Sequence, residues 1–140
     1  MNAPLESYAE FLSSLNEKTV DRFTDYVVKD VLFRDPFNEV CGADRMMQIF
    51  THMYRTIGSV KFDILHHAMM GDVGLLHWRF TSTLRGKPWS FEGMSHIRFD
   101  SDGRVVAHID HWDAAREFYE HFPVVGWALK TIRRKISLEK

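Results

Sequence analysis

Residues 76–112 carry the strongest signal of the fold: LHWRFTSTLRGKPWSFEGMSHIRFDSDGRVVAHIDHW. Apolar and polar residues alternate on both sides of the turn sequence Arg85-Gly86-Lys87-Pro88, and a second turn sequence follows at Asp100-Ser101-Asp102-Gly103. Alternation with a period of two is typical of half-buried strands, and a glycine after Asp is a hairpin signal. This stretch therefore predicts three consecutive antiparallel strands.

The flanking sequence adds one more strand at 60–71 and a set of helices. Helical spacing of apolar residues predicts helices at 5–15 and 20–27, a strand at 28–36, and a helix at 44–57 with Gly58 as its glycine cap. After the last strand, Asp113 caps a short helix and an amphipathic helix follows Pro123. Strands that follow one another, with helices before and after them, predict the α+β class.

Length and composition narrow the class of protein. The 140 residues fit a single domain, 1–140, with 45% hydrophobic and 14% aromatic residues. A net charge of −1 gives no field that would attract nucleic acid. One cysteine, Cys41, excludes an internal disulfide, so we expect an inert thiol and a cytoplasmic location. No apolar run is long enough for integral membrane association, and no signal peptide is visible.

The alternation also sorts the strand faces. Trp78 and Phe80 are expected to face inward, with Arg79 on the outer face. Periodicity alone does not orient the last strand. Asp35 shares its face with apolar residues that are expected to point inward. Burying a carboxylate there costs on the order of several kcal/mol unless the group is paired or hydrated. The alternative is that Asp35-Pro36 opens a turn at a frayed strand end.

The chain resembles the nuclear transport factor 2-like superfamily in three features. These are the order of its elements, the strand end Phe33-Arg34-Asp35-Pro36 and the closing sequence Ile109-Asp110-His111-Trp112-Asp113. That superfamily includes ketosteroid isomerases, SnoaL-like polyketide cyclases, scytalone dehydratase and limonene epoxide hydrolase, and the chain is most similar to its SnoaL-like and ketosteroid isomerase-like branch. The resemblance implies a cone: a strongly curved antiparallel sheet wrapped around N-terminal helices (cystatin-like), with an open pocket. It also implies a homodimer through the sheet.

The resemblance carries over only in part. Asp35 matches the ketosteroid isomerase aspartate that removes a proton next to a carbonyl, but the isomerase's two oxyanion donors correspond to Phe11 and Ser95 here. A phenyl ring donates no hydrogen bond, so steroid isomerisation by that mechanism is not expected. The same resemblance points His108, Asp110 and Trp112 into the cone, with Asp110 at the position of a base in cyclases and epoxide hydrolases.

We therefore expect a pocket for a small hydrophobic molecule, with Asp35 and Asp110 as bases and His108 as proton shuttle or orienting residue. Such chemistry needs no organic cofactor, and no metal site is expected. The expected ligand-binding residues are Phe11, Phe33, Phe50, Trp78, Phe80, Ser82, Ser95, Ile97 and Trp112, the two serines as orienting donors. The function would be a cofactor-independent isomerase, cyclase, dehydratase or hydrolase; the alternative is a non-catalytic ligand-binding or scaffolding protein.

The C-terminal helix has an apolar stripe and a basic face between Trp127 and Lys135. Most such helices dock on their own domain, so we expect docking near the pocket entrance. A lid over the pocket and a weak contact with a membrane surface are the alternatives.

Overall fold

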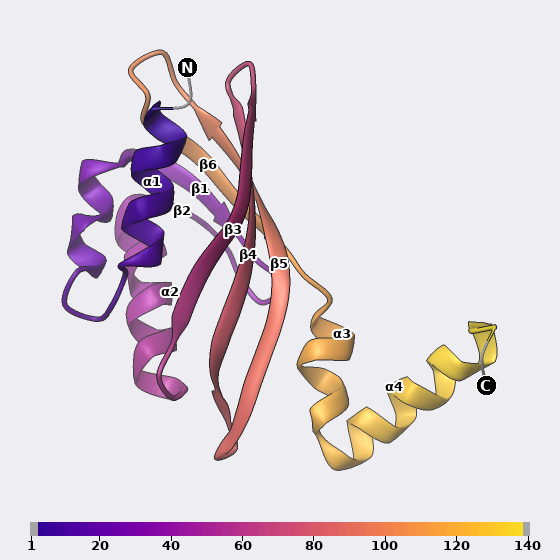
Figure 1. The fold of residues 1–140 in the computed structure, drawn as a ribbon. Coiled ribbons are helices and arrows are strands. Elements are labelled where there is room, and N and C mark those ends of the chain that lie inside the picture. Colours follow the sequence, from indigo (N-terminus) through magenta and orange to yellow (C-terminus); the bar gives the residue numbers. More distant parts are fainter. Residues whose placement is uncertain (1–2, 139–140) are drawn as a thin grey trace.

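The computed structural model describes residues 3–138, which form a curved, unclosed six-stranded sheet with helices packed on one of its faces (Figure 1). This architecture confirms the α+β class predicted from the sequence. The elements, in chain order, are α1 (Ala3–Ser13), the 3₁₀ helix η1 (Val20–Asp25), β1 (Val27–Arg34), β2 (Glu39–Cys41), α2 (Ala43–Thr56), β3 (Lys61–Met70), β4 (Val73–Leu84), β5 (Lys87–Phe99), β6 (Val105–His111), α3 (Ala114–Glu117), the 3₁₀ helix η2 (Tyr119–His121) and α4 (Pro123–Ile136).

The strand order across the sheet is β2-β1-β6-β5-β4-β3. Strands β3 to β6 pair antiparallel with their neighbours in sequence, as expected from the turns between them. By contrast, β1 pairs with β6 in parallel, with Phe33 beside His108 and Arg34 beside Ile109. A parallel pair needs a long crossover, which α2 and strands β3 to β5 provide here. The sheet is therefore antiparallel except at this one pair.

The turn between β4 and β5 explains their long, regular pairing. Arg85 and Gly86 both have positive φ, 54° and 77°, as the two central residues of a type I′ hairpin turn require. The pairing then runs from Leu84 beside Lys87 to Val73 beside Arg98. Such an extended hairpin fixes which residues of both strands share the inner face.

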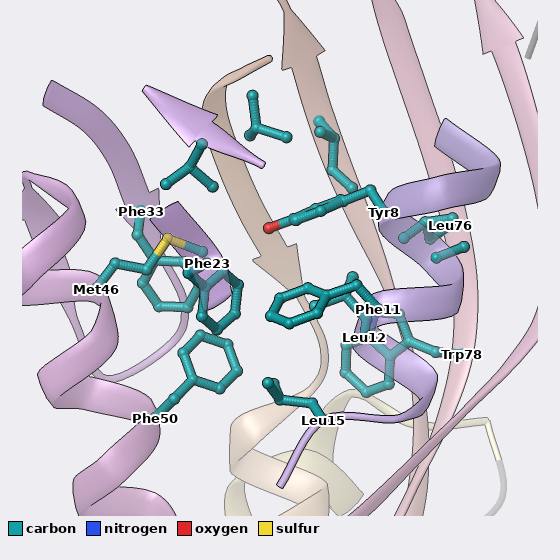
Figure 2. Close-up of a cluster of buried hydrophobic side chains, with 14 of the residues drawn as sticks. Tyr8, Phe11, Leu12, Leu15, Phe23, Phe33, Met46, Phe50, Leu76 and Trp78 are labelled. Atoms are coloured by element: carbon teal, nitrogen blue, oxygen red, sulfur yellow. The ribbon is translucent and has the colours of Figure 1, made fainter. Parts of the chain in front are cut away.

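The inner face of the sheet and the N-terminal helices form the core. On β4, Trp78 and Phe80 are buried while Arg79 is exposed, as the alternation predicted. Helix α1 contributes Tyr8 and Phe11, and η1 contributes Phe23 at the centre of the aromatic cluster drawn in Figure 2. The rings of this cluster are in mutual contact, with Phe23 4.9 Å from both Phe11 and Phe50.

Two N-terminal expectations need correction. Val27 begins β1 instead of continuing a helix, because the 3₁₀ turn closes at Tyr26, whose N–H bonds to the Phe23 carbonyl. Gly58 does not have positive φ and is not a glycine cap; the C-cap of α2 is Ile57, in an extended conformation. The lack of a side chain at Gly58 instead makes room for Thr83, since a Cβ there would lie 1.9 Å from the Thr83 hydroxyl oxygen.

The C-terminal helices behave differently from one another. The short α3 is tied to the sheet, because Trp89 Nε1–H donates to the Glu117 carbonyl at 2.6 Å. Helix α4 instead leads away from the body of the domain, and Trp127 is 70% exposed (Figure 1). The expected docking of this helix near the pocket entrance is therefore wrong.

Candidate active site

A pocket of about 610 Å³ opens at the end of the cone between α2, the inner face of the sheet and α3. Its wall is mostly apolar and aromatic, with two carboxylates, Asp35 and Asp110, at one end. A volume of several hundred Å³ with few polar groups is typical of sites for small organic molecules. The lining residues are Phe33, Asp35, Phe37, Asn38, Val40, Arg45, Gln48, Ile49, Phe50, His52, Met53, Thr56, Ile57, Phe62, Trp78, Phe80, Trp89, Phe91, Asp110, Trp112 and Phe118.

One chain of hydrogen bonds reaches Asp110 from the neighbouring strands. Trp78 Nε1–H donates to Ser95 Oγ at 2.8 Å, and the Ser95 hydroxyl donates to Asp110 Oδ1. Indole N–H can only donate, so it occupies a lone pair of Ser95 and leaves the serine proton for the carboxylate. The β5–β6 register, which places Ser95 beside Asp110, makes this contact possible.

A second chain reaches the same oxygen through His108, which is 2% exposed. His108 Nε2 lies 2.8 Å from Asp110 Oδ1, and Tyr8 Oη lies 2.7 Å from His108 Nδ1. In the neutral imidazole, Nε2–H donates to the carboxylate, so Nδ1 accepts from the Tyr8 hydroxyl. Burial, and then Asp110, raise the pKa of Tyr8 well above its ordinary value, which keeps this hydroxyl a donor.

Both chains end at Oδ1 of Asp110, and they leave Oδ2 without a hydrogen-bond partner among residues 3–138. The carboxylate is thus held in one orientation from behind, while the residue lines the pocket. Asp110 therefore has one fixed oxygen and one that is open to a ligand.

Asp35 is held by the turn that follows β1. Its Oδ1 accepts from the backbone N–H groups of Phe37 and Asn38, at 2.8 and 2.7 Å. Burial nevertheless raises the pKa of the Asp35 carboxyl, and Asp110 raises it further against the opposing effect of these hydrogen bonds. The turn expected at Asp35-Pro36 and the inward position of the carboxylate, which the sequence left as alternatives, are both present.

The parallel pairing of β1 with β6 brings the two carboxylates together. Phe33 and His108 are partners in this pair and are both buried, and Arg34 and Ile109 follow. The next residues are Asp35 and Asp110, which consequently lie side by side on the inner face at the strand ends. Each contributes to the same pocket wall.

The structure separates the expected site residues into three groups. Those in the pocket wall are Asp35, Asp110, Phe33, Phe50, Trp78, Phe80 and Trp112. His108 and Ser95 lie behind Asp110, so both ring nitrogens of His108 are engaged away from the pocket. The residues outside the wall are Phe11, which stacks on Tyr26; Ser82, whose hydroxyl donates to the Gly58 carbonyl; and Ile97, which is buried in the core.

Sequence reasoning missed Tyr8 and Asn38, and it gave Trp78 only an apolar role. Tyr8 has one signal: it is the single residue with a polar tip in the apolar stripe of α1. A buried hydroxyl requires a partner, which marks such a residue for inspection. Nothing in the sequence identifies that partner as His108, one hundred positions away.

We expect Tyr8→Phe to lower the free energy of unfolding by about 1–3 kcal/mol, because it leaves His108 Nδ1 buried without a donor. Tyr54→Phe is the matched control, since the buried Tyr54 hydroxyl has no partner within residues 3–138. Its removal should leave stability unchanged or raise it. Urea unfolding of both variants measures the difference, and equal losses would contradict a stabilising Tyr8–His108 hydrogen bond.

Within residues 3–138, no three His, Cys, Asp or Glu side chains are grouped so that they could hold a metal ion. In the same part of the chain, no helix has the length and apolar character needed to cross a bilayer.

The fold recurs in solved structures of low sequence identity. An NTF2-like protein of unknown function from Burkholderia pseudomallei is 17% identical, with a TM-score of 0.73 over 83% of this chain and 95% of that chain. An LEH-like epoxide hydrolase of M. tuberculosis is also 17% identical, with a TM-score of 0.67 over 97% and 94%. A putative polyketide cyclase from Sinorhizobium meliloti is 14% identical, with a TM-score of 0.66 over 79% and 95%.

A comparison with curated proteins gives no match. The family model of the SnoaL-like domain matches residues 8–108, which include Tyr8, Asp35, Ser95 and His108 and stop two residues before Asp110. This match spans well over half of the sequence, and the similar structures share its NTF2-like fold. The chain therefore belongs to the SnoaL-like domain family.

Proposed function

We propose that this protein is a cofactor-independent enzyme that performs general acid–base chemistry on a small apolar molecule carrying oxygen. The observation that carries the proposal is the pair Asp35 and Asp110, side by side in the wall of an open apolar pocket. Two neighbouring carboxyl groups in such a wall can act as an acid and a base.

Asp110 is the proposed base. Its Oδ1 accepts hydrogen bonds from Ser95 and His108, which leaves Oδ2 to take a proton. The proton would come from a ligand C–H next to a carbonyl, or from a water molecule that attacks the ligand. His108 is then a positioning residue that orients Asp110, which is one of the two roles expected for it from the sequence.

Asp35 is the proposed acid, a role different from the second base expected from the sequence. Burial raises the pKa of its carboxyl, so a larger fraction keeps its proton as the pH approaches neutrality. That proton would pass to the ligand oxygen on which negative charge develops. Proton loss at Asp110 and proton gain at Asp35, through water or product, would complete the cycle.

The family and the similar folds support a role in this range. An epoxide hydrolase and a putative polyketide cyclase share the fold, and both names describe chemistry on small oxygen-containing molecules. Their identities to this chain are 17% and 14%, so the proposal depends on the carboxylate pair and the pocket.

The test combines native mass spectrometry with a turnover assay on steroid-like, polyketide-like and terpene-epoxide ligands. Wild type should bind and convert at least one ligand. The Asp35→Asn/Asp110→Asn variant should bind the same ligand without converting it. Asp30→Asn is the control, since Asp30 is an exposed aspartate on β1. If every form binds a ligand and none converts it, a carrier or scaffolding role replaces the enzyme.

We expect the contribution of Asp35 to the stability of the wild type to fall as the pH rises through the window in which Asp35 titrates. The folded-state pKa of Asp35 lies above the unfolded value of about 3.9, so the unfolded chain loses its proton first. Asp35→Asn keeps an acceptor for the N–H groups of Phe37 and Asn38 and removes this penalty. The unfolding free energy of Asp35→Asn minus that of the wild type should therefore increase from acid to neutral pH, as measured by urea titration. A difference that stays constant with pH would contradict this prediction.

We also propose that the chain forms a homodimer through the outer face of the sheet, in the cytoplasm. Met94 is 46% exposed on β5 and has polar neighbours His77 and His111 in the strand pairing. Such a partly apolar sheet face suits contact with a second copy. Sedimentation equilibrium should give a dimer for the wild type and a monomer for Met94→Glu.

A further inference from the structure

Helix α4 is held to the rest of the protein along one side only. Gly126 packs against the Glu120 carbonyl so closely that a Cβ would lie 2.4 Å from that oxygen. Farther along the helix, Arg133 forms two hydrogen bonds with Glu120, at 2.7 and 3.2 Å. The side of α4 that faces η2 is therefore polar or lacks a side chain.

The opposite side of α4 is apolar and uncovered. Val124, Trp127 and Ile136 are 79%, 70% and 84% exposed, and Val125 and Ile132 are also exposed. A helix that docks on its own domain turns its apolar side inward, whereas α4 turns this side outward. Figure 1 shows α4 leading away from the sheet, so the body of the domain does not cover this surface.

Charge is concentrated on the same helix. The 14 residues of α4 include Lys130, Arg133, Arg134 and Lys135 and no acidic residue, which gives a net charge of +4. The rest of the sequence has 14 of the 18 basic residues and all 19 acidic residues, a net charge of −5. The basic character of the C-terminal segment is thus local and opposite to that of the remaining chain.

We propose that α4 is a membrane-surface helix that binds bilayers containing anionic lipids. An exposed apolar face, a tryptophan and basic side chains beside them are the features of helices that lie in the bilayer interface. Lysine and arginine extend their charged ends to headgroups while their stems stay on apolar surface. The anionic headgroups complement the net positive charge of the helix, in which Arg133 is already paired with Glu120, and distinguish this occupant from a neutral apolar protein groove.

Vesicle sedimentation of the full chain tests the proposal. We expect binding to vesicles of phosphatidylcholine mixed with phosphatidylglycerol, and much weaker binding to phosphatidylcholine alone. Arg134→Gln should weaken binding about fivefold, the effect of one charge near an anionic surface. Salt at about 0.5 M should weaken binding of every form, since it screens these charges. Arg22→Gln, at an exposed arginine on η1, is the charge control and should bind as wild type does.

Trp127→Gln/Ile132→Gln tests the apolar face and should abolish binding at the lipid concentration that half-saturates wild type. Met70→Gln is the matched control, because Met70 is 75% exposed but lies on β3, remote in sequence from the basic helix. Vesicle binding should also shift the tryptophan emission of the wild type. Trp127→Phe should retain binding and lose most of this shift. Circular dichroism of each variant confirms that the fold is intact.

Two results would overturn the proposal. The first is an absence of sedimentation with either kind of vesicle. The second is equal binding by wild type and Trp127→Gln/Ile132→Gln, which would place the lipid contact elsewhere. The first result could be accompanied by self-association of the wild type in sedimentation velocity. If Trp127→Gln/Ile132→Gln removes this self-association, the apolar face is occupied by a second copy of the chain.

Discussion

Asp110→Asn should lower kcat about 10²–10⁴-fold on any ligand that the wild type converts, the usual contribution of a general base. The amide oxygen can still accept from Ser95 and His108, so the geometry behind the residue is preserved. The amide nitrogen at the position of Oδ2 cannot take a proton. Ligand affinity, measured by native mass spectrometry, should stay close to that of the wild type, and stopped-assay kinetics give kcat.

Ser95→Ala provides the comparison for this result. It removes one donor to Asp110 and leaves the Trp78 indole N–H without its acceptor, so it disturbs the orientation of the base without removing it. We expect a smaller fall in kcat together with a loss of about 1–3 kcal/mol of stability. If Asp110→Asn converts the ligand as fast as the wild type, Asp110 is not the base and the assignment passes to Asp35.

Phe23→Ala should have the largest effect on stability, about 3–5 kcal/mol, which is a substantial part of the stability of a typical domain. The Phe23 side chain is fully buried, and its ring lies 4.9 Å from the rings of both Phe11 and Phe50. Truncation removes apolar contacts and leaves a cavity between η1, α1 and α2, because three packed elements cannot all move to fill it. Urea unfolding monitored by circular dichroism measures the loss.

Phe37→Ala is the matched control, since it makes the same chemical change at a ring that is 47% exposed at the pocket mouth. Its ring contacts with Trp112 and Phe118 are on the surface, so its loss of stability should be well below that of Phe23→Ala. Equal losses in the two variants would show that burial in the aromatic cluster does not govern the stability of this fold.

The sequence was sufficient for the four consecutive strands because their signals are local. A period of two fixes which side chains of β4 and β5 share a face, and the turn residues fix where the chain reverses. Trp78 and Phe80 were placed inward on this basis, and both are buried. The same local signal failed for the C-terminal helix, because a pattern of apolar and basic residues shows that a helix has two sides but not which side meets the protein.

The arrangement of the candidate site depended on contacts between segments far apart in sequence. The parallel pairing of β6 with β1 decides which face of β6 points inward, and it sets Asp35 beside Asp110. Tyr8 meets His108 across one hundred positions, and Trp78 reaches Asp110 only through Ser95.

By itself, therefore, the sequence determined the class of fold and every strand except β2, since periodicity and turn chemistry act over a few neighbouring positions. The tertiary structure alone decided which carboxylate oxygen is open to a ligand, why His108 lies behind Asp110 and which side of α4 is uncovered. Each of these depends on strand pairing or helix packing between distant segments, and no local pattern specifies such pairings.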